Sequence, residues 1–373
     1  MELKKYRFDE VSINFDKKRV PLSGAQREKR KGKYRYYGAQ GVIDHIDNFI
    51  FDGTYLLIAE DGENLKSKKQ DIAQVVEGKF WVNNHAHIVQ GNKLCDTRYL
   101  CYLLNSMDLS GHITGSAQPK LSQKNLNSVI LSLPSITEQK AIVDFLYLFD
   151  KKIAVNQQIN DNLLQQLHVL YSQLFCDSDM DTPLGDVVVT KSGGTPSRKH
   201  NEYYSNSLIC WVKSKELLGN YIYETEEHIN DLAINKSSAK LLPEHSILIA
   251  MYGATVGAYG IISKSMTCNQ AVCALLCNED YPYTYLFQIA HESQQRLINL
   301  AVGSAQQNIS QVLIKQLTIH SNLNAIQKFH ALALPLHREI ESLQAENIRL
   351  LSLRDTLLPK FMSGEIDVSA VQF

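Results

Sequence analysis

The sequence contains an internal repeat, and this constrains the fold more than any other feature. Residues 115–123 read GSAQPKLSQ and residues 303–311 read GSAQQNISQ, identical at six of nine positions at an offset of 188. Further matches occur upstream in the same order: 55–62 (YLLIAEDG) with 246–253 (SILIAMYG), and 83–89 (NNHAHIV) with 268–274 (CNQAVCA). Solenoid repeats have periods of about 20–50 residues. The much longer offset here predicts that each copy is a whole domain.

A long helical pattern follows each copy. Apolar residues recur in alternating steps of three and four over 137–175 and 323–362, which is typical of a heptad seam. We predict that the two helices pair with each other; the alternative is that each is a surface helix on its own domain. The predicted seam comprises Leu146, Phe149, Ile153, Asn160, Leu163, Leu167, Leu336, Ile340, Leu343, Asn347, Leu350 and Leu357.

Two positions in these helices carry additional information. Asn160 and Asn347 occupy matching places in the two copies, and a buried Asn on each helix would help to fix the register of the pair. Pro335 lies inside the second pattern and has no backbone N–H to donate. It predicts a kink or a fresh helix start at that point.

The remaining segments mix short β-like runs with helical patterns. The β-like runs are 49–51, 55–58, 80–82, 187–190, 246–251 and 259–262, and the helical patterns are 97–107 and 283–300. The predicted class is α+β, with two duplicated α/β domains separated by two long helices. The predicted order is a first domain over 1–135, a first helix over 136–178, a second domain over 179–322, and a second helix with a tail over 323–373.

The overall charge is balanced. The 373 residues include 38 basic and 39 acidic residues, for a net charge of -1, which excludes a histone-like polycation and an acidic disordered chain. No apolar run approaches the roughly 20 residues of a membrane helix, and the first 22 residues lack the apolar core of a signal peptide. We therefore expect a cytoplasmic protein with no membrane partner.

A strongly basic segment lies near the start of the first copy. Nine basic residues and one acidic residue fall between Lys17 and Arg35, and tyrosines interleave with the end of this run. Cations neutralise phosphates, and Tyr and Arg can contact bases or sugars. The candidate DNA contacts here are Arg27, Lys29, Arg30, Lys31, Lys33, Arg35, Tyr36 and Tyr37. The alternative is an ordinary solvated turn.

The second copy opens with a weaker basic segment, KSGGTPSRK over 191–199. Gly193 and Gly194 would allow close backbone approach to a ligand, and the neighbouring hydroxyls could donate to phosphate. The candidate contacts are Lys191, Thr195, Ser197, Arg198, Lys199 and Lys213. A solvated turn is again the alternative.

Motifs that would indicate catalysis are missing. The sequence has no G-x-x-x-x-G-K-[ST] loop, no Pro-Pro pair of the amino-methyltransferase motif, no Pro-Asp to Glu-x-Lys nuclease pattern, no H-E-x-x-H and no G-x-S-x-G. We therefore predict no catalytic residue in this chain.

Metal and cofactor motifs are equally weak. Cys268, Cys273 and Cys277 lack the paired spacing of a zinc site, so they are predicted to be reduced, buried thiols. His85 and His87 have no counterpart in the second copy and are predicted to be packed or surface histidines. The glycines of 253–260 favour a strand-turn-strand over a cofactor loop. No metal site is predicted.

The order of these motifs resembles the specificity subunit of type I restriction-modification enzymes. The resemblance rests on GGTPS (193–197), the duplicated Gly-Ser-Ala-Gln blocks, and the long helix after each block. It extends to YYGAQG (36–41), FDG (51–53), AEDG (59–62) and LLPKFMSGEI (357–366). The first copy departs from the pattern because it has no Gly-Gly-Thr-Pro-Ser sequence. That departure leaves the contacts of the first domain less defined than those of the second.

The resemblance implies a function and a set of partners. Each domain would be a target recognition domain that reads one half of a split site in double-stranded DNA, and the helices would pack as an antiparallel coiled coil that sets the gap. Modification (methyltransferase) and restriction (translocase and endonuclease) subunits would be the protein partners. This chain would hold no cofactor and be non-catalytic, with S-adenosylmethionine, ATP and Mg on the partner subunits. The alternatives are a coiled-coil scaffold without a DNA role and a stand-alone DNA methyltransferase or nuclease with unrecognised motifs.

Overall fold

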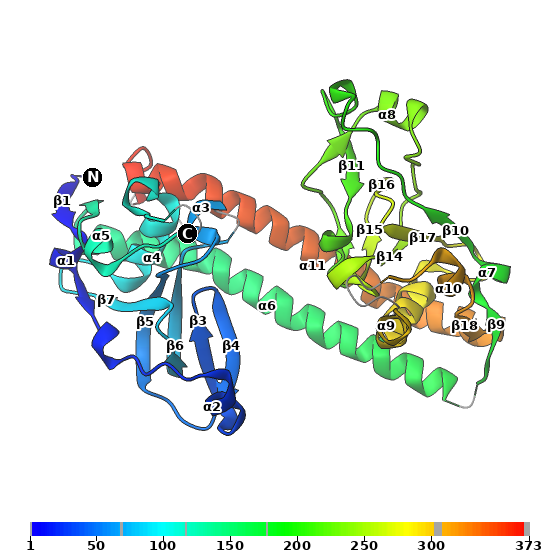
Figure 1. Cartoon of the computed structure of the whole chain (residues 1–373), viewed down its shortest axis with the longest axis horizontal. Helices are drawn as coiled ribbons and strands as arrows, with labels where there is room; N and C mark the ends of the chain where they lie inside the picture. Colours follow the sequence, from blue (N-terminus) through cyan, green and yellow to red (C-terminus); the bar gives the residue numbers. More distant parts are fainter. Residues whose placement is uncertain (1, 68–69, 116–117, 177, 302–307, 369–373) are drawn as a thin grey trace. The chain divides into compact units, whose positions relative to one another are not determined.

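The computed structural model describes residues 2–67, 70–115, 118–176, 178–301 and 308–368. The chain forms two compact units: unit 1 comprises Met1–Lys152 with Leu350–Phe373, and unit 2 comprises Ile153–Arg349. Each unit therefore contains one copy of the repeat and part of each long helix (Figure 1). Parts of the two Gly-Ser-Ala-Gln blocks, at 116–117 and 303–306, lie outside the described residues.

The main sheet of unit 1 has six strands in the order β2-β7-β5-β6-β3-β4. Neighbouring strands are antiparallel except for β3 and β6, which are parallel. The strands are β2 (Ser12–Asn14), β7 (Ala86–Gly91), β5 (Phe51–Ala59), β6 (Ala73–Val82), β3 (Lys31–Gly38) and β4 (Gly41–Ile46). Helix α4 (Thr97–Ser106) contacts β5, β6 and β7, and its buried leucines belong to the same core as β5. Asp96 caps this helix by accepting hydrogen bonds from the backbone N–H groups of Arg98 and Tyr99.

The main sheet of unit 2 repeats this topology. Its order is β10-β17-β14-β15-β12, again antiparallel except for the pair formed by β12 and β15. The strands are β10 (Val189–Ser192), β17 (Val272–Leu276), β14 (Ile247–Ala250), β15 (Tyr259–Ile262) and β12 (Tyr221–Ile222). The matching sequence blocks fall on β5 and β14 and on β7 and β17. The predicted duplication and the α+β class are therefore confirmed.

The start and end of each copy are joined by a two-stranded sheet. In unit 1, β1 (Lys4–Arg7) pairs with β8 (Ile130–Leu133); in unit 2, β9 (Met180–Pro183) pairs with β18 (Thr318–His320). A short helix follows the first strand of each pair, α1 (Phe8–Val11) or α7 (Leu184–Val187). Val187 therefore ends a helix, so the predicted strand start at 187 is wrong. The predicted strand at 49–51 is also wrong for its first two residues, because β5 starts only at Phe51.

Unit 2 has a further small sheet, which has no counterpart among the described residues of unit 1. It consists of β13 (His228–Ile229), β11 (Ile209–Val212) and β16 (Thr267–Cys268), in that order. The remaining short helices are α2 (Gly24–Glu28), α3 (Asn64–Ser67), α5 (Gln123–Asn127), α8 (Asp231–Lys236) and α10 (Gln311–Lys315). The remaining 3₁₀ turns are η1 (Asp16–Lys18), η2 (Ser110–His112), η3 (Asn201–Tyr203), η4 (Ser214–Glu216) and η5 (Gly253–Thr255). Turn η5 joins β14 to β15, so the predicted strand-turn-strand over the glycines of 253–260 is confirmed.

The two predicted long helices are α6 (Ile136–Phe175) and α11 (Leu323–Ser363). The expected fresh start at Pro335 is wrong, because α11 continues through this residue. Proline disrupts an isolated helix by about 3 kcal/mol. Here Phe329, Ala333 and Ile340 are buried in the unit 2 core on both sides of the proline, and their packing holds the helix together.

The two helices contact each other within each unit. In unit 1, the rings of Phe145 and Phe361 lie 5.3 Å apart, and Arg354 Nη1 donates to Asp150 Oδ1 at 2.7 Å. In unit 2, Asn156 Nδ2 donates to Asn347 Oδ1 at 2.8 Å. The partner on α11 moves back along the chain as the residue on α6 moves forward, so the pairing is antiparallel.

Every predicted seam residue is at least partly shielded from solvent. Leu146, Ile153, Asn160, Leu167, Ile340, Leu343 and Asn347 are buried. Phe149, Leu163, Leu336, Leu350 and Leu357 are half-buried.

Asn160 and Asn347 are both buried, as predicted, and Asn347 bonds to Asn156. Because the helices are antiparallel, Asn160 and Asn347 do not face each other. The offset of 187 that matches Asn160 to Asn347 also matches Asn156 to Leu343. By the same offset, the contact equivalent to Asn156–Asn347 pairs Asn160 with Leu343. The Asn160 Oδ1 has no hydrogen-bond partner among the described residues.

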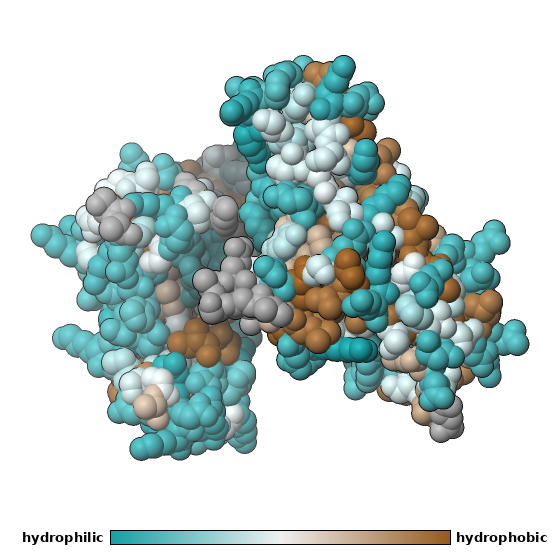
Figure 2. Space-filling view, turned by 45° about the vertical axis from the view of Figure 1, so that its right-hand side comes forward, coloured by the Kyte–Doolittle hydropathy of each residue, from teal (hydrophilic) through white to brown (hydrophobic). Residues whose placement is uncertain are grey.

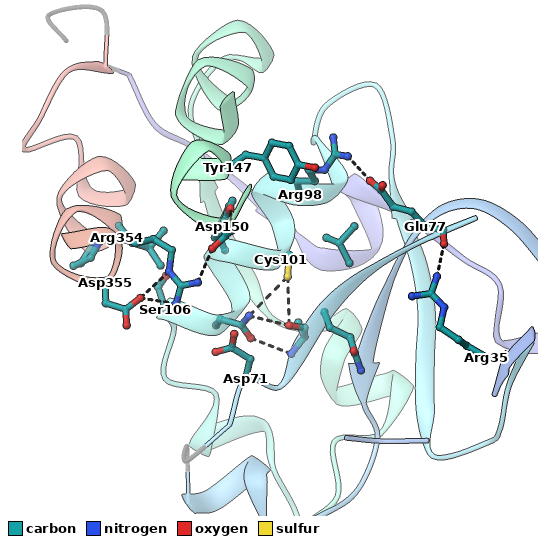
Figure 3. A pocket seen from close by; sticks show the side chains of 17 residues that line it. Arg35, Asp71, Glu77, Arg98, Cys101, Ser106, Tyr147, Asp150, Arg354 and Asp355 are labelled. Atoms are coloured by element: carbon teal, nitrogen blue, oxygen red, sulfur yellow. Dashed lines mark hydrogen bonds and ion pairs between the residues drawn. The ribbon is translucent and has the colours of Figure 1, made fainter. Parts of the chain in front are cut away.

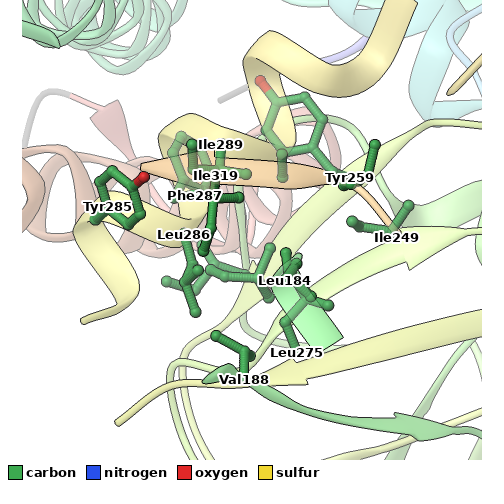
Figure 4. Close-up of a cluster of buried hydrophobic side chains, with 14 of the residues drawn as sticks. Leu184, Val188, Ile249, Tyr259, Leu275, Tyr285, Leu286, Phe287, Ile289 and Ile319 are labelled. Atoms are coloured by element: carbon green, nitrogen blue, oxygen red, sulfur yellow. The ribbon is translucent and has the colours of Figure 1, made fainter. Parts of the chain in front are cut away.

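The largest core of unit 2 lies between its main sheet, α9 (Tyr283–Leu300) and the two long helices. Figure 4 shows sheet residues such as Ile249 and Leu275 facing Leu286 and Phe287 of α9, with Leu184 and Val188 beside them. This packing fixes the sheet from which the loops of the second copy extend.

A buried histidine in unit 2 makes its stability depend on pH. His337 on α11 is 1% exposed, and its Nδ1 lies 3.1 Å from the hydroxyl oxygen of Tyr221. Burial, aided by His245 and His330, lowers the pKa of His337 to about 3. Its ordinary pKa is about 6.5, so the unfolded chain takes up a proton that the folded unit does not. The stability that unit 2 gains from neutral His337 is therefore present above about pH 6.5 and is lost as the pH falls towards 3.

Between pH 7 and pH 5, protonation of His337 in the unfolded chain is expected to lower the free energy of unfolding of unit 2 by about 2 kcal/mol. Urea denaturation followed at each pH measures the change. His337→Gln should flatten the dependence, whereas His200→Gln, at an exposed position, should leave it intact. An equal slope in His337→Gln and the parent chain would contradict the assignment.

Candidate nucleic-acid interface

The basic segment of unit 1 separates into paired and unpaired cations. Arg27 Nε lies 3.1 Å from Asp44 Oδ2, Lys31 Nζ lies 3.0 Å from Asp44 Oδ1, and Arg30 Nη2 lies 2.9 Å from Asp47 Oδ1. The hydrogen bond from Lys31, with others from the His45 N–H and Arg27, lowers the pKa of Asp44 to about 2. The β3–β4 hairpin therefore neutralises three of the predicted contacts with its own carboxylates.

An exposed group of cations and aromatic rings remains on this unit, which we call the Tyr34 cluster: Lys33, Tyr34, Phe49 and Lys79. Lys33 Nζ lies 5.4 Å from the Tyr34 ring centroid, and Lys79 Nζ lies 4.7 Å from that of Phe49. The two rings lie 5.1 Å apart. Both lysines are exposed and have no ion pair among the described residues, so they are available to phosphates. The predicted contact Lys29, just after α2, is exposed in the same way.

Sequence reasoning found Lys33 but missed Phe49 and Lys79. Lys79 lies on β6, and the parallel pairing of β3 with β6 sets Arg35 beside Phe80. This pairing brings Lys79 close to the basic segment, although the two are more than 40 residues apart in the chain. No local signal in the sequence marks this contact.

Two predicted tyrosine contacts are core residues instead. Tyr36 is 0% exposed, and its hydroxyl oxygen accepts a hydrogen bond from the Leu22 N–H at 2.8 Å. Tyr37 is 4% exposed and packs edge-on against Phe80. As neighbours on a strand, the two rings point to opposite faces of β3, and each face is covered: Tyr36 packs with Ile46 and Trp81, and Tyr37 packs with Phe51 and Phe80. Neither ring is available to DNA. Arg35 is exposed and donates from Nη2 to the Glu77 carbonyl oxygen at 2.7 Å.

In unit 2, the structure brings two predicted contacts together in what we call the Trp211 cluster: Arg198, Tyr204, Trp211, Lys213 and Glu227. The Arg198 guanidinium carbon lies 4.3 Å from the Tyr204 ring centroid and 5.4 Å from that of Trp211. Arg198 and Lys213 both pair with the Glu227 carboxylate. Burial would raise the pKa of Glu227, but hydrogen bonds from Lys213 and Arg198 outweigh it and lower this pKa. One carboxylate thus orients two cations.

The two units present a similar tryptophan arrangement. Trp81 Nε1 donates to the Val20 carbonyl oxygen at 2.6 Å, and the Arg30 guanidinium carbon lies 4.8 Å from the indole centroid. Trp211 Nε1 donates to the Gly194 carbonyl oxygen at 2.9 Å, beneath Arg198. In each unit a tryptophan side chain therefore holds the basic segment of that copy through a backbone carbonyl, and an arginine packs on the face of its indole ring.

The other predicted contacts of unit 2 are exposed but more scattered. Thr195, Ser197 and Lys199 are exposed next to Arg198, whereas Lys191 is exposed on β10 of the main sheet. Two exposed leucines, Leu208 (88%) and Leu218 (75%), lie near Trp211 in the sequence. Figure 2 shows mostly hydrophilic residues on the visible face, with hydrophobic residues in separate areas. Among the described residues, no helix has the length and apolar character needed to cross a membrane.

Gly193 and Gly194 have a different role from the one predicted. The Gly194 N–H donates to the Cys268 carbonyl oxygen at 2.9 Å, and the Gly193 N–H donates to that of Val272 at 3.0 Å. A Cβ on Gly193 would lie 2.1 Å from the Asn269 carbonyl oxygen. The close approach is therefore to the chain's own backbone, which threads this segment through unit 2.

Gly194→Ala is expected to destabilise unit 2 by about 1–3 kcal/mol, because its Cβ would lie 2.3 Å from the Ser238 carbonyl carbon. Thermal or urea denaturation measures this loss. Gly111→Ala is the control, since an added Cβ there meets no atom within 4 Å and should cost far less. Equal stabilities for the two variants would contradict the threading role.

Unit 1 contains a hollow with a volume of about 890 Å³. Figure 3 shows Arg354 bonded to Asp150 and Asp355 on one wall, and Glu77 between Arg35 and Arg98 on the other. Burial raises the pKa of the lining thiol, Cys101, to about 12. This thiol stays protonated at neutral pH, so the hollow offers polar binding groups without an activated nucleophile.

The sequence-flagged histidines and cysteines are in structural environments. His87 is buried, with its Nδ1 2.6 Å from Asp16 Oδ2 and its Nε2 2.8 Å from the Leu121 carbonyl oxygen. His85 Nδ1 lies 2.8 Å from Asp61 Oδ2 at the surface. Burial raises the pKa of each of Cys268, Cys273 and Cys277 to about 12. The prediction of a packed or surface position is confirmed for both histidines. The prediction of buried thiols is confirmed for Cys268 and Cys273, whereas Cys277 is half-buried.

These features define a duplicated protein with one cation-bearing α/β domain in each unit. The model of the type I restriction modification DNA specificity domain matches residues 2–165 and 179–342, and the chain belongs to this family. Each match covers one copy of the repeat and the first part of the long helix that follows it.

Individual relatives agree with this assignment. A putative type I restriction enzyme specificity subunit of Haemophilus influenzae is 32% identical over 138 residues, which cover 37% of this chain and 35% of that protein. The type I restriction enzyme MjaIX specificity subunit of Methanocaldococcus jannaschii is 26% identical over 304 residues, or 73% of this chain and 69% of that protein. The crystal structure of the type I restriction-modification S subunit from M. genitalium has the same fold, with a TM-score of 0.59 at 14% identity over 97% of this chain and 96% of that one.

Proposed function

We propose that this chain is the DNA specificity subunit of a type I restriction-modification complex. The observation that carries the proposal is the twofold occurrence of one sheet topology, with the family match falling on both copies. A protein with two versions of one reading domain is suited to a target with two separate parts. Residues 1–135 and 179–322 would be the two target recognition domains.

The exposed cations support DNA as the ligand. The Tyr34 cluster of unit 1 and the Trp211 cluster of unit 2 each combine lysine or arginine with aromatic rings. Cations position a protein on phosphates, and specificity comes from contacts with base edges. The clusters differ in residues and in supporting strands, as expected if the two domains read different half-sites.

The long helices would link the two recognition domains and set the gap between half-sites. Both helices contribute to both units, and they pair in antiparallel fashion in each. They would also dock the modification subunits, with restriction subunits joining the larger assembly. We propose the cytoplasm as the location, where DNA and these partners meet.

The chain itself would be a non-catalytic reader. Its sequence has no phosphate-binding loop, and the hollow of unit 1 is lined by a protonated thiol and arginine-paired carboxylates. S-adenosylmethionine, ATP and Mg would therefore belong to the partner subunits.

The salt dependence of DNA binding tests the proposal against a scaffold without a DNA role. The chain, assembled with its modification subunits, should bind its duplex with an affinity that falls steeply and linearly on logarithmic axes as salt rises. Fluorescence anisotropy measures this slope. A flat dependence, or no duplex binding, would favour the scaffold. Methyl transfer or cleavage by the chain alone would favour the stand-alone enzyme.

A further inference from the structure

The small sheet of unit 2 brings together three side chains of the types that bind zinc. Cys210 lies on β11, and His228 lies directly opposite it on β13 in the antiparallel register. Glu224 lies in the segment that leads into β13. One potential ligand atom from each residue, a thiol sulfur, an imidazole nitrogen and a carboxylate oxygen, lies within 4.8 Å of the other two.

The three side chains converge on one oxygen atom. The Cys210 thiol donates to Glu224 Oε1 at 3.0 Å, and His228 Nε2 contacts the same Oε1. Zinc bonds of about 2.0–2.3 Å at tetrahedral angles separate ligand atoms by about 3.3–3.8 Å. The observed spacing therefore needs only small side-chain movements to admit an ion between the three atoms.

Neighbouring groups hold Glu224 and the backbone around the three side chains. Lys264 Nζ lies 3.5 Å from Glu224 Oε2, whereas Cys210 and His228 contact Oε1. The Thr225 hydroxyl accepts from the Trp211 N–H at 3.1 Å and donates to the Glu227 carbonyl oxygen at 2.7 Å. The Thr267 hydroxyl donates to the Cys210 carbonyl oxygen at 2.9 Å. Such supporting bonds tune and orient metal ligands in proteins.

Access and charge suit a divalent ion as well. Cys210 is buried, but the Glu224 side chain is 62% exposed and that of His228 is 28% exposed, which leaves a route from solvent. A thiolate and a carboxylate together neutralise a 2+ ion. The fourth tetrahedral position remains for water.

The attachment of β13 to β11 is short. Their ladder contains the pairs Ile209–Ile229 and Cys210–His228. On one side Ile229 packs with Tyr203, Trp211, Ala233 and Ala239, whereas Cys210 and Val212 of β11 belong to a separate, larger buried cluster. A structural metal can stabilise a small substructure of this kind.

We propose that Cys210, Glu224 and His228 form a zinc site that fastens β13 to β11. Zinc binding displaces the Cys210 thiol proton to solvent and forms bonds to the sulfur, to Glu224 Oε1 and to His228 Nε2. The residue immediately before His228, Glu227, binds Arg198 and Lys213. The ion therefore fixes the segment that positions the cations of the Trp211 cluster. The site stands on unit 2 alone and does not depend on the DNA-reading proposal.

Cobalt absorption tests the site in the full chain after removal of metal with a chelator. One equivalent of Co²⁺ should give tetrahedral visible bands together with a thiolate-to-cobalt charge-transfer band, and Zn²⁺ should abolish both. The second possible cluster, His168, His291 and Glu292, has no thiol and cannot give the thiolate band. Absence of that band in the parent chain at millimolar Co²⁺ would overturn the proposal.

Variants assign the ligands. Cys210→Ser should abolish the thiolate band, and Glu224→Gln and His228→Asn should each weaken metal binding by about 100-fold or more. Cys277→Ser, in the same unit, should retain the band, as should His168→Gln. The exposed Glu224 serves as a variant that leaves the fold intact, which circular dichroism checks. A thiolate band that persists in Cys210→Ser would also overturn the proposal.

Discussion

Duplicating one heptad in each long helix is expected to lengthen the gap between the two half-sites by up to about 3 base pairs. The design inserts a copy of residues 153–159 after Lys152 and a copy of residues 344–350 after Leu350. Seven residues add about 10.5 Å to a helix, and base pairs are about 3.4 Å apart. The inserted segments carry Asn156 and Asn347, so the added heptads reproduce the existing Asn pair. Both insertions fall at the boundary between the units, which leaves the internal contacts of each unit unchanged.

The measurement is binding of the assembled complex to duplexes in which the gap varies one base pair at a time. The half-site sequences should stay the same while the preferred gap increases. Insertion into α6 alone is the matched control; it puts the two helices out of register and should abolish ordered binding. If the double insertion leaves the preferred gap unchanged, the helices do not set the gap between the half-sites.

Replacing Lys29, Lys33 and Lys79 together with Ala is expected to weaken DNA binding on the order of 100-fold at physiological salt. Each phosphate contact contributes about 0.9 to the slope of log affinity against log salt, so loss of three contacts should reduce the slope by about 2.7. All three lysines are exposed and have no ion pair among the described residues, so their removal leaves no buried charge behind. Anisotropy titrations at several salt concentrations measure both quantities.

A second triple variant controls for the general loss of positive charge. Lys5, Lys93 and Lys124 are also exposed in unit 1 but lie outside the basic segment and the Tyr34 cluster. Their replacement with Ala should change the affinity and the slope far less. If the two triple variants bind DNA equally well, the Tyr34 cluster is not the interface of unit 1.

Much of the fold could be predicted because the duplication and the heptad pattern are properties of the sequence alone. The match between 55–62 and 246–253 predicts the equivalent strands β5 and β14, and the heptad pattern predicts the helices α6 and α11. Two details depended on tertiary packing. Pro335 was predicted to kink the helix or to start a new one, but α11 continues through it within the unit 2 core. The partner of Asn347 is set by the antiparallel register, which the heptad pattern does not specify.

The candidate interface was harder to predict because charge in the sequence does not show how charges pair. Arg27, Arg30 and Lys31 belong to the basic segment, but the carboxylates that neutralise them lie on and just after β4, 13 or 17 residues away. Tyr36 and Tyr37 were expected at the surface, and the strand turns them into the core. Lys79 joins the cluster only through the pairing of β3 with β6. Local composition therefore located the segment but not which of its side chains face solvent.

The most direct test of the central claim is to map DNA methylation in cells that express this chain with its modification and restriction subunits. The account predicts one chain-dependent motif, made of two short specified elements separated by a gap of fixed length and unspecified sequence. Replacing the segment 179–322 with that of another family member should change one element and leave the other unchanged. A single continuous motif, or methylation that does not depend on this chain, would contradict the account.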